Sequence, residues 1–340
     1  MSGTEQIATD IGLWGIPLAV LGGAIRVGTP ILYVSLGECI TEKSGRVNLG
    51  LEGTLVMGAV TGYGISYVTR LAGLPPEVCP WVGVLAAGIV GMLLGAMHAG
   101  ICNLPRVNSV AVGIAMMVFG VALAFCLGKN LIQPVAPKLP AIEFGAWSSI
   151  EQLSFALRVN ALFLIGVLLA PFLWWALRST RWGMILRLAG ESEEASLAMG
   201  YNVNTIRTYA TALGGFLAGV GGSYLSLYYP GSWNEQLSSG QGLMAVALVI
   251  FARWNPMYCL GASLLFGGVG SLGSALQGQD LSSTFLAQWF SPTLLTYLTS
   301  AAPAYLWNAA PYILTLFIMV LTSSRSRALA GAPGALTAIK

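Results

Sequence analysis

The run from Val107 to Gly128 reads VNSVAVGIAMMVFGVALAFCLG and contains no charged side chain. A helix needs about 20 mainly apolar residues to cross the roughly 30 Å of hydrocarbon in a bilayer. The apolar residues of this run are continuous rather than alternating, which indicates a helix and not a strand of a membrane barrel. The run therefore predicts one membrane-spanning helix.

Similar charge-poor runs recur along the whole chain of 340 residues. Apolar residues make up 56% of the sequence and charged residues only 9%, whereas a soluble domain has about 45 to 50% and about 25%. Glycine contributes 43 residues, and small residues allow membrane helices to approach closely. We therefore predict an all-α, polytopic transmembrane helix bundle. The net charge of +3 is too small to indicate a nucleic acid partner.

The hydropathy pattern predicts about nine spans, or about ten if the first run forms two half-helices at Gly28, Thr29 and Pro30. A further segment, 281–300, is less apolar and is expected to be a lid or an interfacial helix instead of a span. The organisation is a short tail (1–11), one membrane domain (12–325) with a polar loop (179–207), and a C-terminal tail (326–340). The expected spans cover residues 12–40, 50–69, 80–101, 107–128, 160–178, 208–228, 239–252, 256–273 and 305–322.

Lysine and arginine accumulate on the cytoplasmic side of membrane proteins. With the loop 179–207 inside, most positive residues fall inside, and the C-terminus is cytoplasmic in a multi-pass protein of the cell inner (plasma) membrane. Pro80–Cys102 and Pro256–Gly278 then run in opposite directions, as an inverted repeat requires. The residues placed inside are Lys43, Arg46, Arg106, Arg178, Arg181, Arg187, Arg207, Arg253, Arg325, Arg327 and Lys340; those placed outside are Arg70, Lys129, Lys138 and Arg158.

The strongest local signal lies in the segment Arg187–Asn202, RLAGESEEASLAMGYN. Ser192 is a good N-cap, two glutamates follow in the first turn, and Gly200 suits the left-handed position after a helix end. This pattern predicts a helix of about two turns, with an apolar side that the adjacent loop cannot cover. The helix either lies on the lipid headgroups or docks in a groove of a partner protein, and its acidic start favours the partner.

A second motif is the segment Leu36–Gly53, LGECITEKSGRVNLGLEG. Together the two segments resemble motifs of the inner-membrane permeases of ABC importers for ribose-type sugars, branched-chain amino acids and purine nucleosides, and the segment from Leu36 is similar to that of the simple sugar and nucleoside permeases. The resemblance covers residues 28–325. Cys39 and Thr41 depart from it at positions where apolar or small residues are typical.

The resemblance implies a cobalamin-importer-like permease fold and a subunit that moves a nucleoside or simple sugar into the cytoplasm. It implies an ABC ATPase that binds ATP and Mg²⁺, a second permease that is a different chain, and an extracytoplasmic substrate-binding protein as partners. This chain itself is expected to need no cofactor and no metal. The two-turn helix corresponds to the family's coupling helix, whose residues here are Glu191, Ser192, Glu194, Ala195, Leu197, Ala198, Met199 and Gly200.

Carboxylates at the edge of an apolar run usually face a partner, water or a pore. Glu38, Asn48 and Glu52 are therefore candidates for the pathway or its gate, in which Glu38 and Glu42 could pair with Lys43 and Arg46. Alternatively, they cap helix ends and fix a re-entrant loop at Gly45, Gly50 and Gly53. Two further pathway candidates open spans, where helix capping is the alternative: Asn108 and Gln241.

A phosphate-binding loop, GxxxxGK[ST], is absent, because Lys43-Ser44 lacks the preceding glycine and Gly128-Lys129 is followed by asparagine. We therefore expect a transport subunit and not an ATPase. A membrane enzyme is disfavoured because no catalytic motif occurs. The main alternative is an ion-coupled secondary transporter, which predicts ionisable residues near the bilayer midplane, whereas the acids here lie mainly near span ends.

Overall fold

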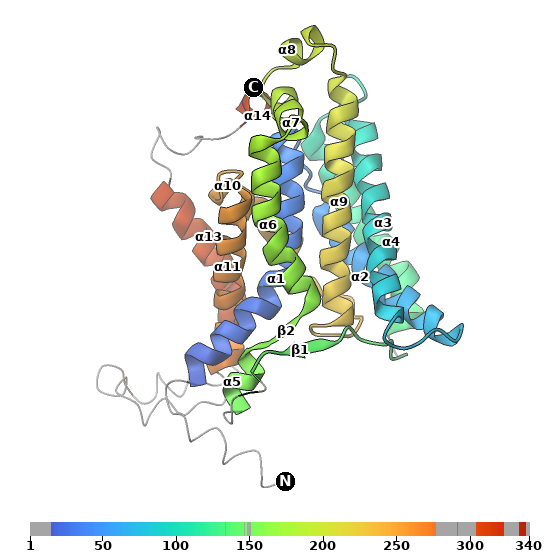
Figure 1. Cartoon of the computed structure of the whole chain (residues 1–340), viewed down its shortest axis with the longest axis vertical. Helices are drawn as coiled ribbons and strands as arrows, with labels where there is room; N and C mark the ends of the chain where they lie inside the picture. The colour runs from blue at the N-terminus through green and yellow to red at the C-terminus, as the bar shows by residue number, and fades with distance from the viewer. Residues whose placement is uncertain are drawn as a thin grey trace.

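The computed structural model describes residues 15–132, 134–145, 147, 151–276, 291, 304–322 and 333–337. A helix occupies each of the predicted spans in this part of the chain, and these helices run side by side in one bundle (Figure 1). The segment 281–300 lies outside the described residues except at Ser291. The helices that match the spans are α1 (Gly15–Lys43), α2 (Leu51–Leu71), α3 (Cys79–Cys102), α4 (Ser109–Gly128), α6 (Ala161–Ser179), α9 (Val203–Leu227), α10 (Gln241–Phe251), α11 (Pro256–Leu276) and α13 (Ala304–Thr322).

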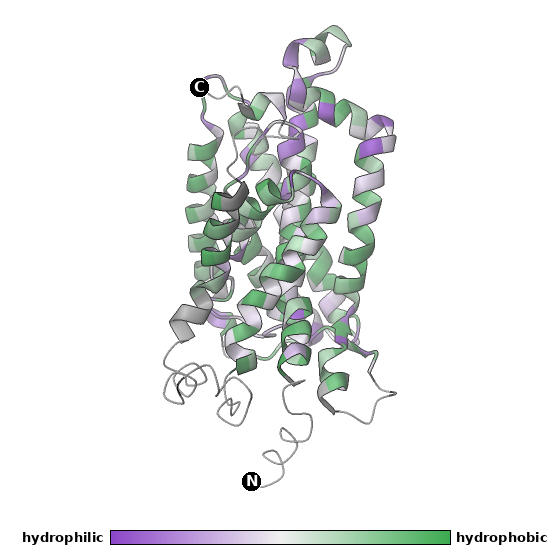
Figure 2. Cartoon of the chain, turned by 90° about the vertical axis from the view of Figure 1, so that its left-hand side faces the viewer, coloured by the Kyte–Doolittle hydropathy of each residue, from purple (hydrophilic) through white to green (hydrophobic). Residues whose placement is uncertain are grey.

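Six of these helices are long and apolar enough to cross a membrane, namely α1, α3, α4, α6, α9 and α11. Hydrophobic residues dominate the middle of the bundle (Figure 2). The chain is therefore a multi-pass membrane protein, as predicted. Helix α2 carries charged residues at both ends, and most of its side chains are buried by neighbouring helices.

The predicted span at 239–252 needs correction. Helix α10 has only 11 residues and is about 16 Å long, roughly half the hydrocarbon thickness. The segment before it is not helical but folds back into the bundle, where Trp233 is 2% exposed and Leu237 8%. Irregular backbone is tolerated at this depth when protein buries it. Hydropathy locates the apolar run but does not show that its helix begins inside the bundle, because that depth depends on contacts with residues far away in the sequence.

Helix α1 is continuous through Gly28, Thr29 and Pro30, so the alternative of two half-helices is wrong. Its first part leans away from the rest of the helix (Figure 1), as expected for a proline inside a helix. Thr29 Oγ1 donates to the carbonyl of Ile25 at 2.6 Å. A Cβ on Gly28 would clash with the backbone of Ser263 in α11, so the glycine serves close packing rather than a helix break.

At the centre of the bundle, glycines of one helix pack directly against the backbone of a neighbouring helix. A Cβ on Gly91 of α3 would clash with the carbonyl oxygen of Gly215 of α9, and a Cβ on Gly215 would clash with that of Gly91. A Cβ on Gly58 of α2 would likewise clash with the backbone of Gly219 of α9. Small residues permit such approaches in membranes, where no hydrophobic force drives helices together. These contacts confirm the tight packing that the glycine content predicts.

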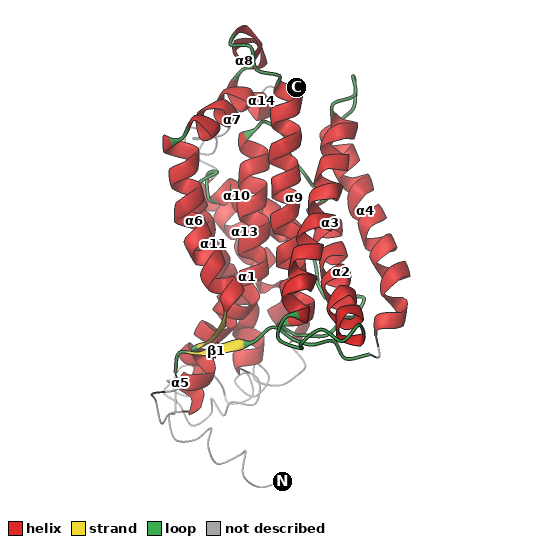
Figure 3. Cartoon of the chain, turned by 45° about the vertical axis from the view of Figure 1, so that its right-hand side comes forward, coloured by secondary structure: helices red, strands yellow, loops and turns green. Residues whose placement is uncertain are grey.

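The smaller elements gather at the two ends of the bundle (Figures 1 and 3). One end carries η3 (Lys129–Leu131), β1 (Ala141–Glu143), α5 (Glu151–Ala156) and β2 (Arg158–Asn160). Strands β1 and β2 pair antiparallel, with Ile142 opposite Val159. The opposite end carries α7 (Arg181–Glu191), α8 (Glu193–Ala198) and α14 (Gly334–Thr337).

The order of the helices separates the charges as the topology predicts. Most described cations lie at the ends of helices on the α8 side, whereas Arg70, Lys129, Lys138 and Arg158 lie at the other end (Figure 1). Helices α3 and α11 run in opposite directions, as the inverted repeat requires, and the repeat itself stays a prediction. Arg325, Arg327 and Lys340 are outside the described residues.

Candidate functional site

Helix α8 forms where the sequence predicts it. Ser192 is its N-cap, and its Oγ accepts a hydrogen bond from Ala195 N at 3.2 Å. Glu193 and Glu194 occupy the first turn, and Gly200 has φ +83° after the helix. Local capping chemistry is therefore sufficient to fix both ends of this helix.

The apolar side of α8 is uncovered, again as predicted. Leu197 is 59% exposed and Met199 61% exposed, and Ala198 is also exposed, whereas Ala195 is half-buried and Ser196 is buried. Glu191 is exposed, and its carboxylate accepts a hydrogen bond from Gly334 N of α14 at 3.1 Å. The helix projects beyond the bundle (Figure 1), so its apolar side is free to contact another protein.

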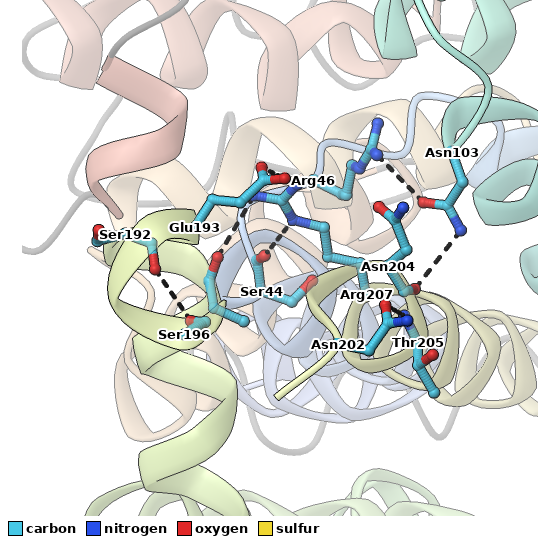
Figure 4. A network of polar contacts seen from close by, with 11 residues as sticks. Ser44, Arg46, Asn103, Ser192, Glu193, Ser196, Asn202, Asn204, Thr205 and Arg207 are labelled. Carbon is cyan, nitrogen blue, oxygen red and sulfur yellow. Dashed lines mark hydrogen bonds and ion pairs between the residues drawn. The ribbon is translucent and has the colours of Figure 1, made fainter. Parts of the chain in front are cut away.

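Arg207, at the start of α9, joins α8 to the bundle (Figure 4). It is 8% exposed. Its Nε donates to the carbonyl of Ser44 at 3.1 Å, and Nη2 donates to that of Ala189 at 3.3 Å. Nη1 lies 3.4 Å from Glu193 Oε2. A buried cation is costly unless it is paired and hydrogen-bonded, so these bonds hold α7, α8, α9 and the end of α1 together.

A second polar contact, between Arg46 and Asn103, lies beside this network (Figure 4). Arg46 Nη2 donates to Asn103 Oδ1 at 3.2 Å, and Asn103 Nδ2 donates to Thr208 Oγ1 at 3.0 Å. Beside it lies a cavity of about 550 Å³ lined by Arg46, Arg106, Asn108, Glu193 and Arg207, among others.

Asn108 lies in the wall of this cavity and also caps α4, because its Oδ1 accepts from Val110 N at 2.8 Å and Ala111 N at 3.3 Å. Asn108 therefore caps a helix, as the structural alternative predicted. Its role in the pathway stays a prediction.

The acidic candidates of the Leu36–Gly53 motif are buried and bonded. Glu38 Oε1 accepts from Asn48 N at 2.7 Å, and Asn48 Oδ1 accepts from Gly50 N at 2.9 Å. Glu42 accepts a short hydrogen bond from the indole N–H of Trp254. Within the described ranges, neither glutamate pairs with Lys43 or Arg46. These contacts fit the alternative in which Glu38 and Glu42 have a structural role and hold the loop and the helix ends in place.

Glu52 holds the first turn of α10. Its Oε2 accepts from Gly242 N at 2.7 Å and Leu243 N at 3.4 Å. Its Oε1 accepts from Ser238 Oγ at 2.5 Å and Gly240 N at 3.2 Å. The amides of a helix N-terminus have no partner within the helix and favour negative charge. Glu52 therefore anchors a helix that begins inside the bundle.

Gln241, the first residue of α10, sits beside this anchor. Its Oε1 is buried and accepts no hydrogen bond from the described residues. We call Glu52, Ser238 and Gln241 the inner polar site. Broken helices whose N-termini open inside the bundle are where many transporters bind their solutes, so the inner polar site is the candidate for solute contact.

Three residues of these networks were not predicted as functional: Arg207, Ser238 and Trp254. Arg207 was counted only as a loop cation, although a cation that opens an apolar span signals a bonded network. Ser238 and Trp254 carry no sequence signal, because their partners lie far away in the chain. In the described ranges, no three His, Cys, Asp or Glu side chains are placed to hold a metal ion.

A membrane helix bundle with a short helix that starts inside it is typical of a membrane transport protein. The sequence agrees: residues 20–323 match the family described as the branched-chain amino acid transport system permease component. The chain belongs to this permease family.

Individual relatives carry narrower names. The chain is 29% identical to TsgC13 of Haloferax volcanii, provisionally named a glucose ABC transporter permease, over 88% of this chain and 90% of that protein. It is 27% identical to the nucleoside ABC transporter permease NupC of Lactococcus lactis, over 89% and 91%. It is 29% identical to the guanosine ABC transporter permease NupQ of Bacillus subtilis, over 86% and 96%.

Proposed function

We propose that this chain is the membrane-spanning permease subunit of an ATP-driven ABC importer in the cell inner membrane. The observation that carries the proposal is the exposed apolar side of α8, with Leu197 and Met199 more than half exposed, on a helix bonded firmly to the bundle. Such a helix suits insertion into a groove of an ATPase subunit. The permeases that this chain resembles along most of its length carry ABC transporter names.

The contacts suggest how movement of α8 reaches the solute. A displaced α8 pulls on Arg207, which is bonded to Ser44 at the end of α1. The neighbouring Glu42 holds Trp254, which follows α10, and Glu52 holds the other end of α10. ATP binding and hydrolysis in the partner would therefore shift α10 and alter the inner polar site. In this mechanism the ATPase, and not this chain, binds ATP and Mg²⁺.

The charges support an orientation. The end with α8 carries most of the described lysine and arginine residues, and this supports a cytoplasmic side for that end and for the C-terminus. An extracytoplasmic binding protein would then dock at the end that carries β1 and β2. A second permease, a different chain, would complete the pathway beside this one.

We further propose a nucleoside or simple sugar as the solute, because the relatives are named for guanosine, nucleosides and glucose. The inner polar site suits such solutes, since the Gln241 side chain has hydrogen-bonding capacity that the described residues leave unused.

The test is co-purification of the tagged chain in mild detergent with the products of its neighbouring genes, comparing Leu197→Asp with Leu104→Asp. The two leucines are 59% and 58% exposed, and Leu104 follows α3 at the same end of the bundle as α8. We expect an ATPase and a second permease with the native chain and with Leu104→Asp, and loss of the ATPase alone with Leu197→Asp. Solute uptake without ATP by the chain alone would overturn the proposal in favour of a secondary transporter.

A further inference from the structure

A second, smaller cavity lies at the α8 end of the bundle, between α6, α7, the end of α1 and the connection from α10 to α11. Its volume is about 260 Å³, and its wall includes four cationic side chains and two indoles. The lining residues that matter here are Lys43, Arg178, Arg187, Arg253, Trp174 and Trp254. No carboxylate lines it, so its charge is strongly positive.

None of the four cations of this cavity lies within ion-pairing distance of a carboxylate in the described part of the chain. Arg187 donates only to backbone carbonyls, those of Gly183 at 3.4 Å and Arg178 at 3.5 Å. Glu42 contacts the cavity wall through the indole N–H of Trp254, but it is 2% exposed and does not line the cavity, so the four cations outnumber it.

The backbone is strained where it supplies Arg253. Arg253 and Trp254 have φ +48° and +55°, a region that side chains other than glycine rarely adopt. Trp254 is 4% exposed and held by Glu42, and this anchoring leaves Arg253 exposed at the cavity. Strain of this kind persists only where the surrounding structure enforces it, and it often marks a ligand site.

Exposed apolar side chains lie on α6, the helix that supplies Trp174 and Arg178 to the wall of the cavity. On α6, Phe172 is 56% exposed and Trp175 52% exposed, and Trp174 stacks under Arg178 with 5.5 Å from guanidinium to ring centroid. Tryptophan is typical of the depth at which headgroups lie. Basic pockets between membrane helices on the cytoplasmic side bind anionic headgroups.

We propose that this cavity binds the phosphodiester headgroup of an acidic phospholipid such as phosphatidylglycerol, with the acyl chains along the exposed face of α6. The arginines supply paired donors to the phosphate oxygens, and the indoles fill the interfacial layer. Only the assignment to the cytoplasmic leaflet rests on the proposed function; the binding itself does not. An acidic segment of a partner protein fits less well, because the neighbouring α6 surface is apolar and not covered by polar groups.

The test is a lipid titration of the delipidated full chain in detergent, followed by native mass spectrometry. The probes are dioleoyl phosphatidylglycerol and dioleoyl phosphatidylcholine. The test variant is Arg178→Gln with Arg253→Gln. The matched control is Arg70→Gln with Arg181→Gln, which removes the same charge outside the cavity. Each interfacial arginine contributes about fivefold in affinity, so we expect about 25-fold weaker phosphatidylglycerol binding in the test variant and less than twofold change in the control.

A third variant, Arg178→Lys with Arg253→Lys, keeps both positive charges and should keep most of the affinity. It shows whether weaker binding by the glutamine variant is due to the lost charge or to misfolding. Equal binding of both lipids by the native chain, or an unchanged affinity in the glutamine variant, overturns the proposal. Displacement of phosphatidylglycerol by excess inorganic phosphate would show that the cavity binds free anions. If the glutamine variant kept its lipid but no longer co-purified with the ATPase, the cavity would instead be a protein interface. Because lipid binding is measured on the isolated chain, failure here leaves the importer proposal standing.

Discussion

Glu52 Oε2, in the first turn of α2, accepts a hydrogen bond from Gly242 N, in the first turn of α10, at 2.7 Å. The two residues are far apart in sequence, yet this carboxylate satisfies amides that α10 cannot satisfy itself. Gly242 is also required for the approach, because a Cβ there would clash with Glu52. The contact explains why a short helix is stable with its N-terminus inside the bundle.

Glu52→Gln should loosen this N-terminus. The amide lacks the negative charge that favours a helix start and turns an NH₂ group toward backbone donors, so we expect a loss of about 1 to 3 kcal/mol of stability and reduced transport. Thermal unfolding in detergent and uptake in vesicles measure the two effects. The control is Glu77→Gln, an exposed glutamate before α3. Equal stability of the two variants would show that Glu52 does not anchor α10.

Gly91→Ala should destabilise the contact between α3 and α9. The added methyl group meets the carbonyl oxygen of Gly215, and overpacking of this kind costs about 1 to 3 kcal/mol. Gly100→Ala is a matched control in the same helix, because nothing lies within 4 Å of a Cβ there. We expect a lower unfolding temperature for Gly91→Ala and an unchanged or slightly higher one for Gly100→Ala. The reverse order would contradict the helix packing.

The features that depend on neighbouring residues were predictable from the sequence, whereas those that depend on contacts between distant residues were not. The apolar runs located the helices, and the serine, glutamates and glycine around α8 fixed its ends, because helix caps depend on neighbouring residues. The half-length of α10 was not predictable, since it depends on the contact of Glu52 with Ser238 and Gly240. Arg207 was found only in the structure, because Ser44, Ala189 and Glu193 meet it through tertiary packing.

Arg207→Lys should uncouple ATP hydrolysis from transport while keeping the charge. Lysine presents one point charge instead of the planar set of donors that reaches Ser44, Ala189 and Glu193. In the reconstituted complex we expect ATPase activity to persist while uptake per ATP falls severalfold. Arg181→Lys, at an exposed position in α7, should leave the ratio unchanged. An unchanged ratio in Arg207→Lys would exclude the network from coupling.

Gln241→Ala tests the inner polar site as the place of solute contact. Because Gln241 Oε1 has no partner among the described residues, its removal should cost little stability. If the side chain forms a hydrogen bond with the solute, the loss of this neutral hydrogen bond, about 0.5 to 1.5 kcal/mol, raises the KM of uptake about 2-fold to 12-fold. Uptake of labelled nucleosides and hexoses measures this change. Gln236→Ala, at an exposed position before α10, is the control and should keep the native KM. A native KM in Gln241→Ala, with the unfolding temperature also unchanged, would show that the solute does not contact the start of α10 through this side chain.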